Sequence, residues 1–327
     1  MSARVSGPAA AQSIEIVVPR EGRGARLDRF VAREIGVSRS ELQRWIAHGR
    51  VTVNGGRCEA SASLREGEHV VVAPEAAPAT AAHPDERVRF DVVYTDDAII
   101  VIDKPAGLVV HPARGHDRGT LVNGLLALGL FRREDLIEEG DESTHTRPGI
   151  VHRLDKGTSG VMVVARTPHA REALKAQFQV HSIERAYEAV VVGSAKTRTI
   201  ATLHGRNPRD RLRFTTHVSH GKPAVTHVRV IALLDGATHV ECTLETGRTH
   251  QIRVHLAETG NPVLGDPLYG HAPRQAHLRT LSERLGRQAL HARILGIVHP
   301  TTGARMRFEA PPPADFREAL EGARIRT

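Results

Sequence analysis

The spacing of apolar residues predicts a small unit of two helices and a hairpin over residues 24–73. The first helix is expected to end at Gly36, because glycine favours helix C-termini. Its apolar face, repeating at helical spacing, is formed by Leu27, Phe30, Val31 and Ile35. Ser38 and Glu41 predict a capping box that opens a second helix, whose apolar face is formed by Leu42, Trp45 and Ile46.

A hairpin is expected directly after these helices. Residues 51–53 alternate as in a strand and run into Asn54-Gly55-Gly56, a strong signal for a tight hairpin turn. Residues 69–72 supply a last strand. The second helix also carries cations around its apolar face, namely Arg39, Arg44, His48 and Arg50.

The flanking segments have no such pattern. Residues 1–23 are expected to form a tail that is disordered at its start, because residues 1–13 are Ala-rich and polar. Residues 74–87 are expected to form a linker, since residues 74–84 are rich in Ala and Pro and lack periodicity.

Strands and helices alternate irregularly from residue 88 to residue 327. Strands are expected at 88–94 and 99–103 around an Asp96-Asp97 turn, and at 185–193, 224–234 and 238–246. Helices are expected at 120–130, at 167–180 behind Thr167-Pro168, and at 249–259 before Gly260. Because the helices do not follow strict βαβ alternation, the predicted fold class is α+β with a mixed, largely antiparallel sheet and flanking helices.

Composition narrows the class of protein. The chain has 327 residues, and none of its apolar runs reaches the roughly 18 residues that a membrane span requires. Its N-terminal stretch lacks the apolar segment of a secretory signal. The two cysteines, Cys58 and Cys242, are too far apart in sequence for a metal-ligand motif, and the twenty histidines are scattered. The expectation is a cytoplasmic protein with no disulfide framework and no metal site.

Charge indicates a polyanionic partner. The formal net charge is +8, which favours nucleic acid first and an anionic membrane second. Between His204 and Lys222 a loop containing Gly, Pro and Asn holds five Arg or Lys residues against Asp210 alone. Phosphate contacts explain such a loop better than a solvated charged face does.

Residues 152–160, His-Arg-Leu-Asp-Lys-Gly-Thr-Ser-Gly, place one carboxylate between two cations. Glycines on both sides and an apolar strand after them suggest a loop that delivers Asp155 from a rigid scaffold. The flanking charges of Arg153 and Lys156 favour the ionised carboxylate, which can act as a nucleophile or as a base. The alternative is an ordinary surface turn whose Asp is charge-compensated.

Two further segments carry candidate chemistry. Tyr187 lies in a predicted strand among charged residues, where it could stack on a ring or simply pack on the core. In residues 245–255, a helix opened by Thr249 would place His250 and Arg253 on one face. Arg248 and Arg253 would then bracket a helix N-terminus as an anion site, although Arg253 could equally pair with a buried carboxylate.

Together these segments resemble the RluA/RluD family of RNA pseudouridine synthases. The family motif H-R-L-D-x-x-T-S-G is matched at 152–160, and K-P-x-G-L-V-V-H-P at 104–112. Tyr187 matches the R-x-Y-x-A strand, residues 247–255 match G-R-T-H-Q-I-R-V-H, and residues 265–270 match G-D-P-x-Y-G. The resemblance covers residues 24–310 and is closest to the RluD branch, which modifies large-subunit ribosomal RNA. Residues 24–73 are similar to the S-four-type RNA-binding domain, also called an α-L domain, through R-L-D-x-F at 26–30 and V-x-V-N-G at 51–55.

The resemblance implies the following roles for residues. Asp155 would address the ribose, either by attacking the anomeric carbon or by removing a neighbouring sugar proton, without a cofactor. Arg253 would pair with Asp155, and Tyr187 would stack on the target base and could assist removal of the proton from its ring carbon. Arg153 would occupy the space that the flipped base leaves.

The remaining implied contacts are with RNA. Phosphates would be held by Lys156 and Arg248, and by the basic loop with Arg206, Arg209, Arg211 and Arg213. The small domain would contribute Arg39 and Arg44. The partner expected from the resemblance is ribosomal RNA, with transfer RNA as the alternative substrate, and the protein is expected to act as a monomer.

Two other classes of protein were weighed. Asp155-Lys156-Gly157-Thr158 is superficially similar to an aspartyl-phosphate loop, but its Thr and Gly are transposed and no acidic Mg²⁺ motif follows. A non-catalytic RNA-binding protein that assists ribosome assembly is the second alternative. The joint presence of Asp155, Tyr187 and Arg253 argues against it.

Overall fold

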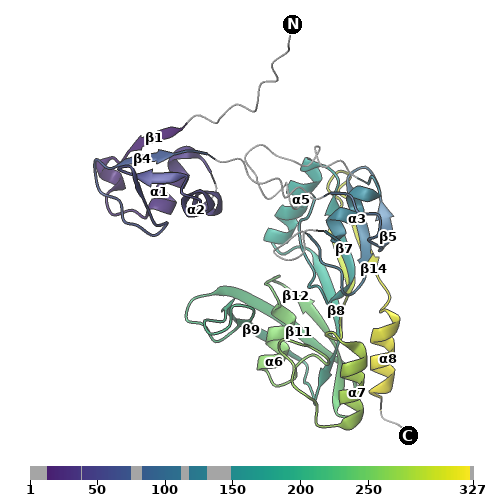
Figure 1. Ribbon diagram of the computed structural model, residues 1–327. Helices are drawn as coiled ribbons and strands as arrows, with labels where there is room; N and C mark the ends of the chain where they lie inside the picture. The colour runs from purple at the N-terminus through teal and green to yellow at the C-terminus, as the bar shows by residue number, and fades with distance from the viewer. Residues whose placement is uncertain (1–12, 38, 75–82, 112–117, 131–148, 325–327) are drawn as a thin grey trace. The chain divides into compact units, whose positions relative to one another are not determined.

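The computed structural model describes residues 13–37, 39–74, 83–111, 118–130 and 149–324, which belong to two compact units (Figure 1). One unit precedes residue 80, and the other begins there. Ser38, the start of the predicted tail and most of the predicted linker lie outside the described residues. Within the described part, none of the helices is both long enough and apolar enough to span a membrane.

The N-terminal unit contains the predicted helices α1 (Leu27–Ile35) and α2 (Arg39–Ala47). Its sheet has the order β1-β4-β2-β3, formed by β1 (Ile14–Val17), β2 (Val51–Val53), β3 (Gly56–Arg57) and β4 (His69–Val72). Asn54 and Gly55 both have positive φ, 50° and 78°, as the predicted tight turn requires. The helix and hairpin predictions are confirmed.

Strand β1 corrects one prediction, because it lies inside the segment that was expected to be a tail. Ile14 to Val17 pair antiparallel with Val72 to His69 of β4. The predicted hairpin leaves one edge of β4 open, and pairing with β1 satisfies the backbone groups along that edge. This partner lies more than 50 residues away in sequence, so local periodicity could not reveal it.

The second unit is built on one ten-stranded sheet (Figure 1). The strand order is β10-β9-β11-β12-β8-β13-β7-β6-β5, and β14 also pairs with β13. The strands are β5 (Asp91–Thr95), β6 (Ile99–Lys104), β7 (Ser159–Ala165), β8 (Glu184–Val192), β9 (Arg198–Arg206), β10 (Phe214–Thr215), β11 (Lys222–Leu233), β12 (Ala237–Leu244), β13 (Leu290–Val298) and β14 (Arg305–Glu309). β13 and β7 pair in parallel and the other pairs are antiparallel, which confirms the predicted mixed, largely antiparallel sheet.

Among the described residues of this unit, the helices are α3 (Leu121–Ala127), α5 (Pro168–Gln179), α6 (Gln251–Glu258), α7 (Ala276–Leu285) and α8 (Ala314–Gly322). The predicted cap of α5 is confirmed, since the Thr167 hydroxyl accepts from the Ala170 N–H at 3.1 Å. Helix α3 is shorter than predicted, because Thr120 is its N-cap and the helix already ends at Ala127, before Gly129 with its positive φ of 62°. Strands β9, β10, β13 and β14 and helices α7 and α8 were not anticipated.

Strand β7 is buried on both faces. Val161 and Val163 pack in a cluster that includes Leu174 of α5. Met162 and Val164 point the opposite way, into a cluster that includes Leu121 and Leu125 of α3. A strand covered on both faces reads as a continuous apolar run, which explains Val161-Met162-Val163-Val164.

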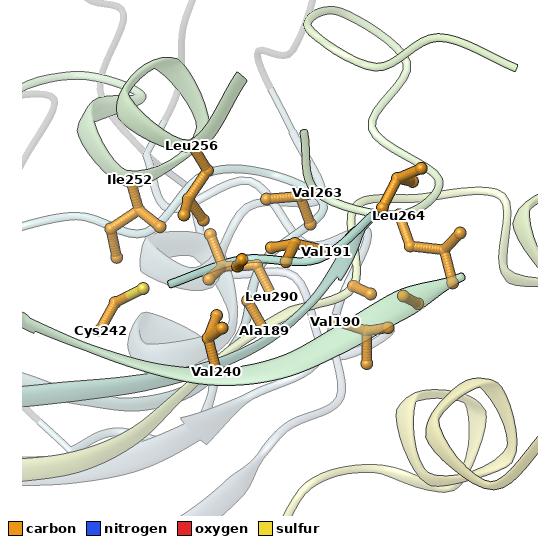
Figure 2. Packing of buried hydrophobic residues seen from close by; sticks show 14 of the residues in the cluster. Ala189, Val190, Val191, Val240, Cys242, Ile252, Leu256, Val263, Leu264 and Leu290 are labelled. Atoms are coloured by element: carbon orange, nitrogen blue, oxygen red, sulfur yellow. The ribbon is translucent and has the colours of Figure 1, made fainter. Parts of the chain in front are cut away.

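Helix α6 packs on the other half of the sheet. Figure 2 shows Ile252 and Leu256 among side chains from β8 and β12, including Val191 and Val240. This apolar pair, predicted from its spacing of four residues, fixes the rotation of α6 about its axis. The helix starts at Gln251, not at Thr249 as expected, because His250 takes a left-handed conformation with φ 58° and ψ 18°.

Candidate active site

The loop that carries Asp155 is anchored by its own neighbours before it enters β7. Leu154 is buried in the same cluster as Met162. The His152 ring accepts from the Val163 N–H at 3.0 Å, and burial lowers the pKa of His152 to about 3, so the ring is a neutral acceptor. The Thr158 N–H closes a turn on the Asp155 carbonyl at 3.0 Å.

The glycines after Asp155 are explained by close approach to β13 and to Gln288, two residues before that strand. A Cβ on Gly157 would lie 2.5 Å from the Gln288 amide oxygen. Gly160 has φ +120°, and a Cβ there would lie 2.1 Å from the Ala292 carbonyl oxygen. The Gly-Thr-Ser-Gly segment is therefore required for β7 to pair in parallel with β13 directly behind the loop.

The backbone around Asp155 is also fixed from outside the loop. The Lys156 carbonyl accepts from the Gly107 N–H at 2.7 Å and from the Lys104 ammonium at 3.4 Å. The Gly157 carbonyl accepts from the Arg287 guanidinium at 3.2 Å. These contacts connect the loop to the segment after β6 and to the segment before β13, so Asp155 projects from a rigid base.

Arg253 of α6 joins Asp155 to a second carboxylate, Asp266. Its Nη1 donates to Asp155 Oδ2 at 2.9 Å, while Nε and Nη2 donate to Asp266 Oδ2 and Oδ1 at 2.7 and 2.8 Å. The Arg253 side chain is 6% exposed and that of Asp266 is 0% exposed. Burial by itself would raise the pKa of Asp266. The two hydrogen bonds from Arg253 and its positive charge outweigh this effect and hold the pKa of Asp266 below its usual value.

Asp266 is the site residue that the sequence reasoning missed. It lies in the Gly-Asp-Pro-x-Tyr-Gly motif, which was recognised without a role for its carboxylate. Asp266 Oδ1 also accepts from the Leu268 and Tyr269 N–H groups at 2.9 and 3.0 Å. The only signal in the sequence was an acidic residue in a Gly/Pro turn downstream of an unexplained arginine.

The expected anion site between Arg248 and Arg253 is wrong. The guanidinium of Arg253 is buried and bonded to two carboxylates, whose negative charges would repel a phosphate. Arg248 donates through Nε to the Pro223 carbonyl at 3.0 Å, on β11. The alternative, in which Arg253 serves a buried carboxylate, is confirmed for Asp266.

Tyr187 lies at the same site, on β8. It pairs with Cys242 of β12 and Ala292 of β13, in the middle of the sheet. The half-buried ring shares a pocket with Asp155 and Arg253, lined further by Arg153, Leu154, Thr158, Leu244, Arg248, His250, Gln251, Ile252 and Leu290. Burial raises the pKa of Tyr187, and the negative charge of Asp155 adds to this effect, so the phenol is protonated at neutral pH.

A second hollow is also lined by Asp155. Its basic lining comes from Arg153, Lys156 and Arg287, and its apolar lining from Pro267, Leu268 and Leu285. Arg153 and Lys156 are exposed beside the carboxylate. His250 borders both hollows, and its Nε2 lies 3.8 Å from Asp155 Oδ1.

The basic loop between β9 and β11 is more ordered than expected. Arg206 ends β9, and β10 pairs back onto β9, so the segment forms a hairpin. Asn207 Oδ1 accepts from the Arg209 and Asp210 N–H groups, at 2.9 and 3.2 Å. All four of the predicted RNA-contacting arginines of this hairpin are exposed: Arg206, Arg209, Arg211 and Arg213.

In the N-terminal unit, Arg39 is held by a buried carboxylate. The Asp28 side chain is 0% exposed, and its Oδ2 lies 2.8 Å from Arg39 Nη2 and 3.2 Å from Arg26 Nη2. Hydrogen bonds from these arginines and from Gln43 hold the pKa of Asp28 well below its usual value. The side chains of Arg26 and Arg39 remain nearly half exposed.

Two family models match the chain. The model for RNA pseudouridylate synthase matches residues 98–258, and the model for the S4 domain matches residues 25–70. A solved structure of human RNA pseudouridylate synthase domain containing 1 aligns with a TM-score of 0.52 and 26% identity, over 70% of this chain and 86% of that one. The structure of human RNA pseudouridylate synthase domain containing 4 gives the same TM-score at 23% identity, over 72% and 94%.

Curated relatives match over nearly the full length. The ribosomal large subunit pseudouridine synthase D of Neisseria meningitidis is 43% identical over 95% of this chain and 82% of that protein. The protein of the same name from Pseudomonas aeruginosa is 44% identical over 91% and 92%. An RNA pseudouridine synthase of Bacillus subtilis is 42% identical over 95% and 98%. The chain therefore belongs to the RNA pseudouridylate synthase family and is an isomerase that acts on uridine in RNA.

Proposed function

We propose that this protein converts specific uridines of large-subunit ribosomal RNA to pseudouridine, with Asp155 as the group that acts on the ribose. The observation that carries the proposal is the ion pair between Asp155 and Arg253, at 2.9 Å, in a pocket that Tyr187 also lines. The choice of RNA rests on the names of the relatives from Neisseria and Pseudomonas.

The isomerisation breaks the bond from the ribose to the uracil nitrogen and rejoins the base through carbon. Asp155 would either attack the anomeric carbon or remove a neighbouring sugar proton to give a glycal, and the geometry is compatible with both. Arg253 binds Oδ2, so Oδ1 is the oxygen presented to the sugar. Asp266 keeps the guanidinium in place while this happens.

Tyr187 would stack on the target base. Because burial raises the pKa of its phenol, a phenolate that removes the ring-carbon proton is disfavoured at neutral pH, and stacking is the better-supported role. The base must leave its own stack to reach Tyr187, at a cost of a few kcal/mol. Arg153, which is exposed and lines both hollows, would fill the vacated space.

The phosphate contacts would come from three places. Lys156 and Arg248 flank the site, and the hairpin after β9 contributes Arg206, Arg209, Arg211 and Arg213. The S4 domain would add Arg39 and Arg44 on α2. That the protein acts in the cytoplasm and as a monomer stays a prediction. Light scattering after size-exclusion chromatography would measure its mass in solution.

Release of tritium from C5-labelled uridine tests the proposal, because C5 is the carbon that rejoins the sugar. Asp155→Asn should abolish release from a large-subunit ribosomal RNA transcript while filter binding of that RNA persists. Asp97→Asn, in an exposed turn, is the matched control and should release tritium at the wild-type rate. Turnover by Asp155→Asn would remove Asp155 from the mechanism. Release from transfer RNA transcripts in place of ribosomal RNA would replace the proposed substrate.

A further inference from the structure

His250 lies near the oxygen of Asp155 that Arg253 does not bind, and none of the roles above uses it. Its Nε2 lies 3.8 Å from Asp155 Oδ1, while Arg253 Nη1 binds Oδ2. A carboxylate held through one oxygen can still rotate about the bond to its β-carbon. A donor at the second oxygen would stop that rotation, and such contacts often shorten when the substrate binds.

The other ring nitrogen of His250 is held by Tyr269. His250 Nδ1 lies 2.9 Å from the Tyr269 hydroxyl, which also accepts from the Phe214 N–H at 2.8 Å. A phenol has one proton, and the backbone N–H can only donate. The hydroxyl proton can therefore be donated to Nδ1, which makes Nδ1 the acceptor and leaves the ring proton on Nε2, facing Asp155.

The backbone of His250 supports a specific placement of this ring. Its φ of 58° and ψ of 18° are left-handed, a conformation that residues other than glycine adopt infrequently. Edge-on contacts with Phe214 and Tyr269, at centroid distances of 5.7 and 5.6 Å, enclose the ring. A strained residue enclosed on two sides and directed at the reacting carboxylate is expected at a functional position.

We propose that His250 is a positioning residue for Asp155, and that its neutral ring, oriented by Tyr269, donates from Nε2 to Oδ1 and fixes the plane of the carboxylate. The inference rests on the proposed role of Asp155. Two-point fixation of the carboxylate favours the geometry needed for reaction with the sugar, so it acts on the chemical step. RNA affinity is expected to be unaffected.

The charges around the ring determine how acid should act. Asp155 and Arg153 face it from the loop before β7, Arg253 from α6 and Asp266 from the turn at 265–270. Burial lowers the pKa of His250, although Asp155 opposes the shift, so the ring is neutral at pH 7. When the ring is protonated, its positive charge would hold Oδ1 in an ion pair and compete with the sugar for it.

Two substitutions separate the two ring nitrogens. His250→Asn places an amide at the position of Nδ1, so it keeps the Tyr269 contact and tolerates the left-handed backbone. His250→Gln can place an N–H at the position of Nε2 and restore the donor to Asp155. Single-turnover tritium release should fall roughly tenfold in the Asn variant, the effect of one hydrogen bond to a charged group, and stay near wild type in the Gln variant. The KM for RNA should change in neither variant. Because both variants lose the edge-on ring contacts, their melting curves serve to show that each is folded at the assay temperature.

The pH profile gives a second readout. The ratio of the wild-type rate to the His250→Gln rate should fall as the pH is lowered from 7.5, because only the wild-type enzyme has a ring at position 250 that can be protonated. Other pH-dependent steps are common to both enzymes and cancel in the ratio. A constant ratio, or equal losses in the Asn and Gln variants, would overturn the inference. If Asp155→Asn is inactive and both His250 variants react at the wild-type rate, this inference is overturned and the proposed function stands. Turnover by Asp155→Asn would overturn the proposed function as well.

Discussion

Replacing Asp266 by Asn should destabilise the second unit by about 3–5 kcal/mol, the usual effect of removing one partner from a buried ion pair. Asp266 accepts two bonds from Arg253, at 2.7 and 2.8 Å, and two from the backbone, and its side chain is 0% exposed. An amide can accept through one oxygen only, and its NH₂ group would face the guanidinium donors. Arg253 would then be a buried cation whose remaining carboxylate partner is Asp155.

Urea denaturation followed by circular dichroism would measure this loss. The chain has a single tryptophan, Trp45, and it lies in the core of the N-terminal unit, so its fluorescence serves as an internal reference. The fluorescence transition should not move in Asp266→Asn. The exposed pair of Asp210 and Arg213 supplies the matched control, and Asp210→Asn should cost at most about 1 kcal/mol. Equal losses in the two variants would refute the reasoning.

Four other outcomes are expected. Gly160→Ala should destabilise the protein by about 2 kcal/mol or more in urea, because φ is +120° and the Cβ would meet the Ala292 carbonyl. Tyr187→Phe should keep most of the tritium release, whereas Tyr187→Leu should lose about 1–3 kcal/mol of stacking; a fully inactive Phe variant would argue for chemistry at the hydroxyl. Burial lowers the pKa of Lys104 from 10.5 to about 7, so between these two values the unfolded state binds more protons than the folded state. The urea midpoint of unfolding should therefore rise when the pH is raised from 7 to 9.5. Lys104→Met should not show this rise. Arg39→Gln should weaken RNA binding and flatten its salt dependence, and an unchanged salt slope would remove it from the interface.

Features that depend on neighbouring residues were predictable from the sequence. The Asn54-Gly55 turn, the Thr167 cap of α5 and the apolar pair of α6 each follow from chemistry within a few residues. The same holds for the Asp155 loop, whose flanking glycines and following apolar run indicated a turn entering a buried strand. The roles of the site residues then followed from the family resemblance, because a set of motifs in the family's order indicates which side chains form the site even when their geometry is unknown.

Features that depend on strand order required the structure. Asp155 and Arg253 are 98 residues apart in sequence. They meet because α6 packs over β8 and β12, and from there Arg253 reaches the loop before β7. The same packing gave Arg253 its second carboxylate, Asp266, and brought His250 and Tyr269 to the site. Strands β1 and β13 likewise owe their partners to distant segments. Strands β10 and β14 each pair with the strand directly before them in sequence. Long-range pairing is decided by which surfaces can be buried together, and that depends on the whole chain folding at once rather than on any local pattern.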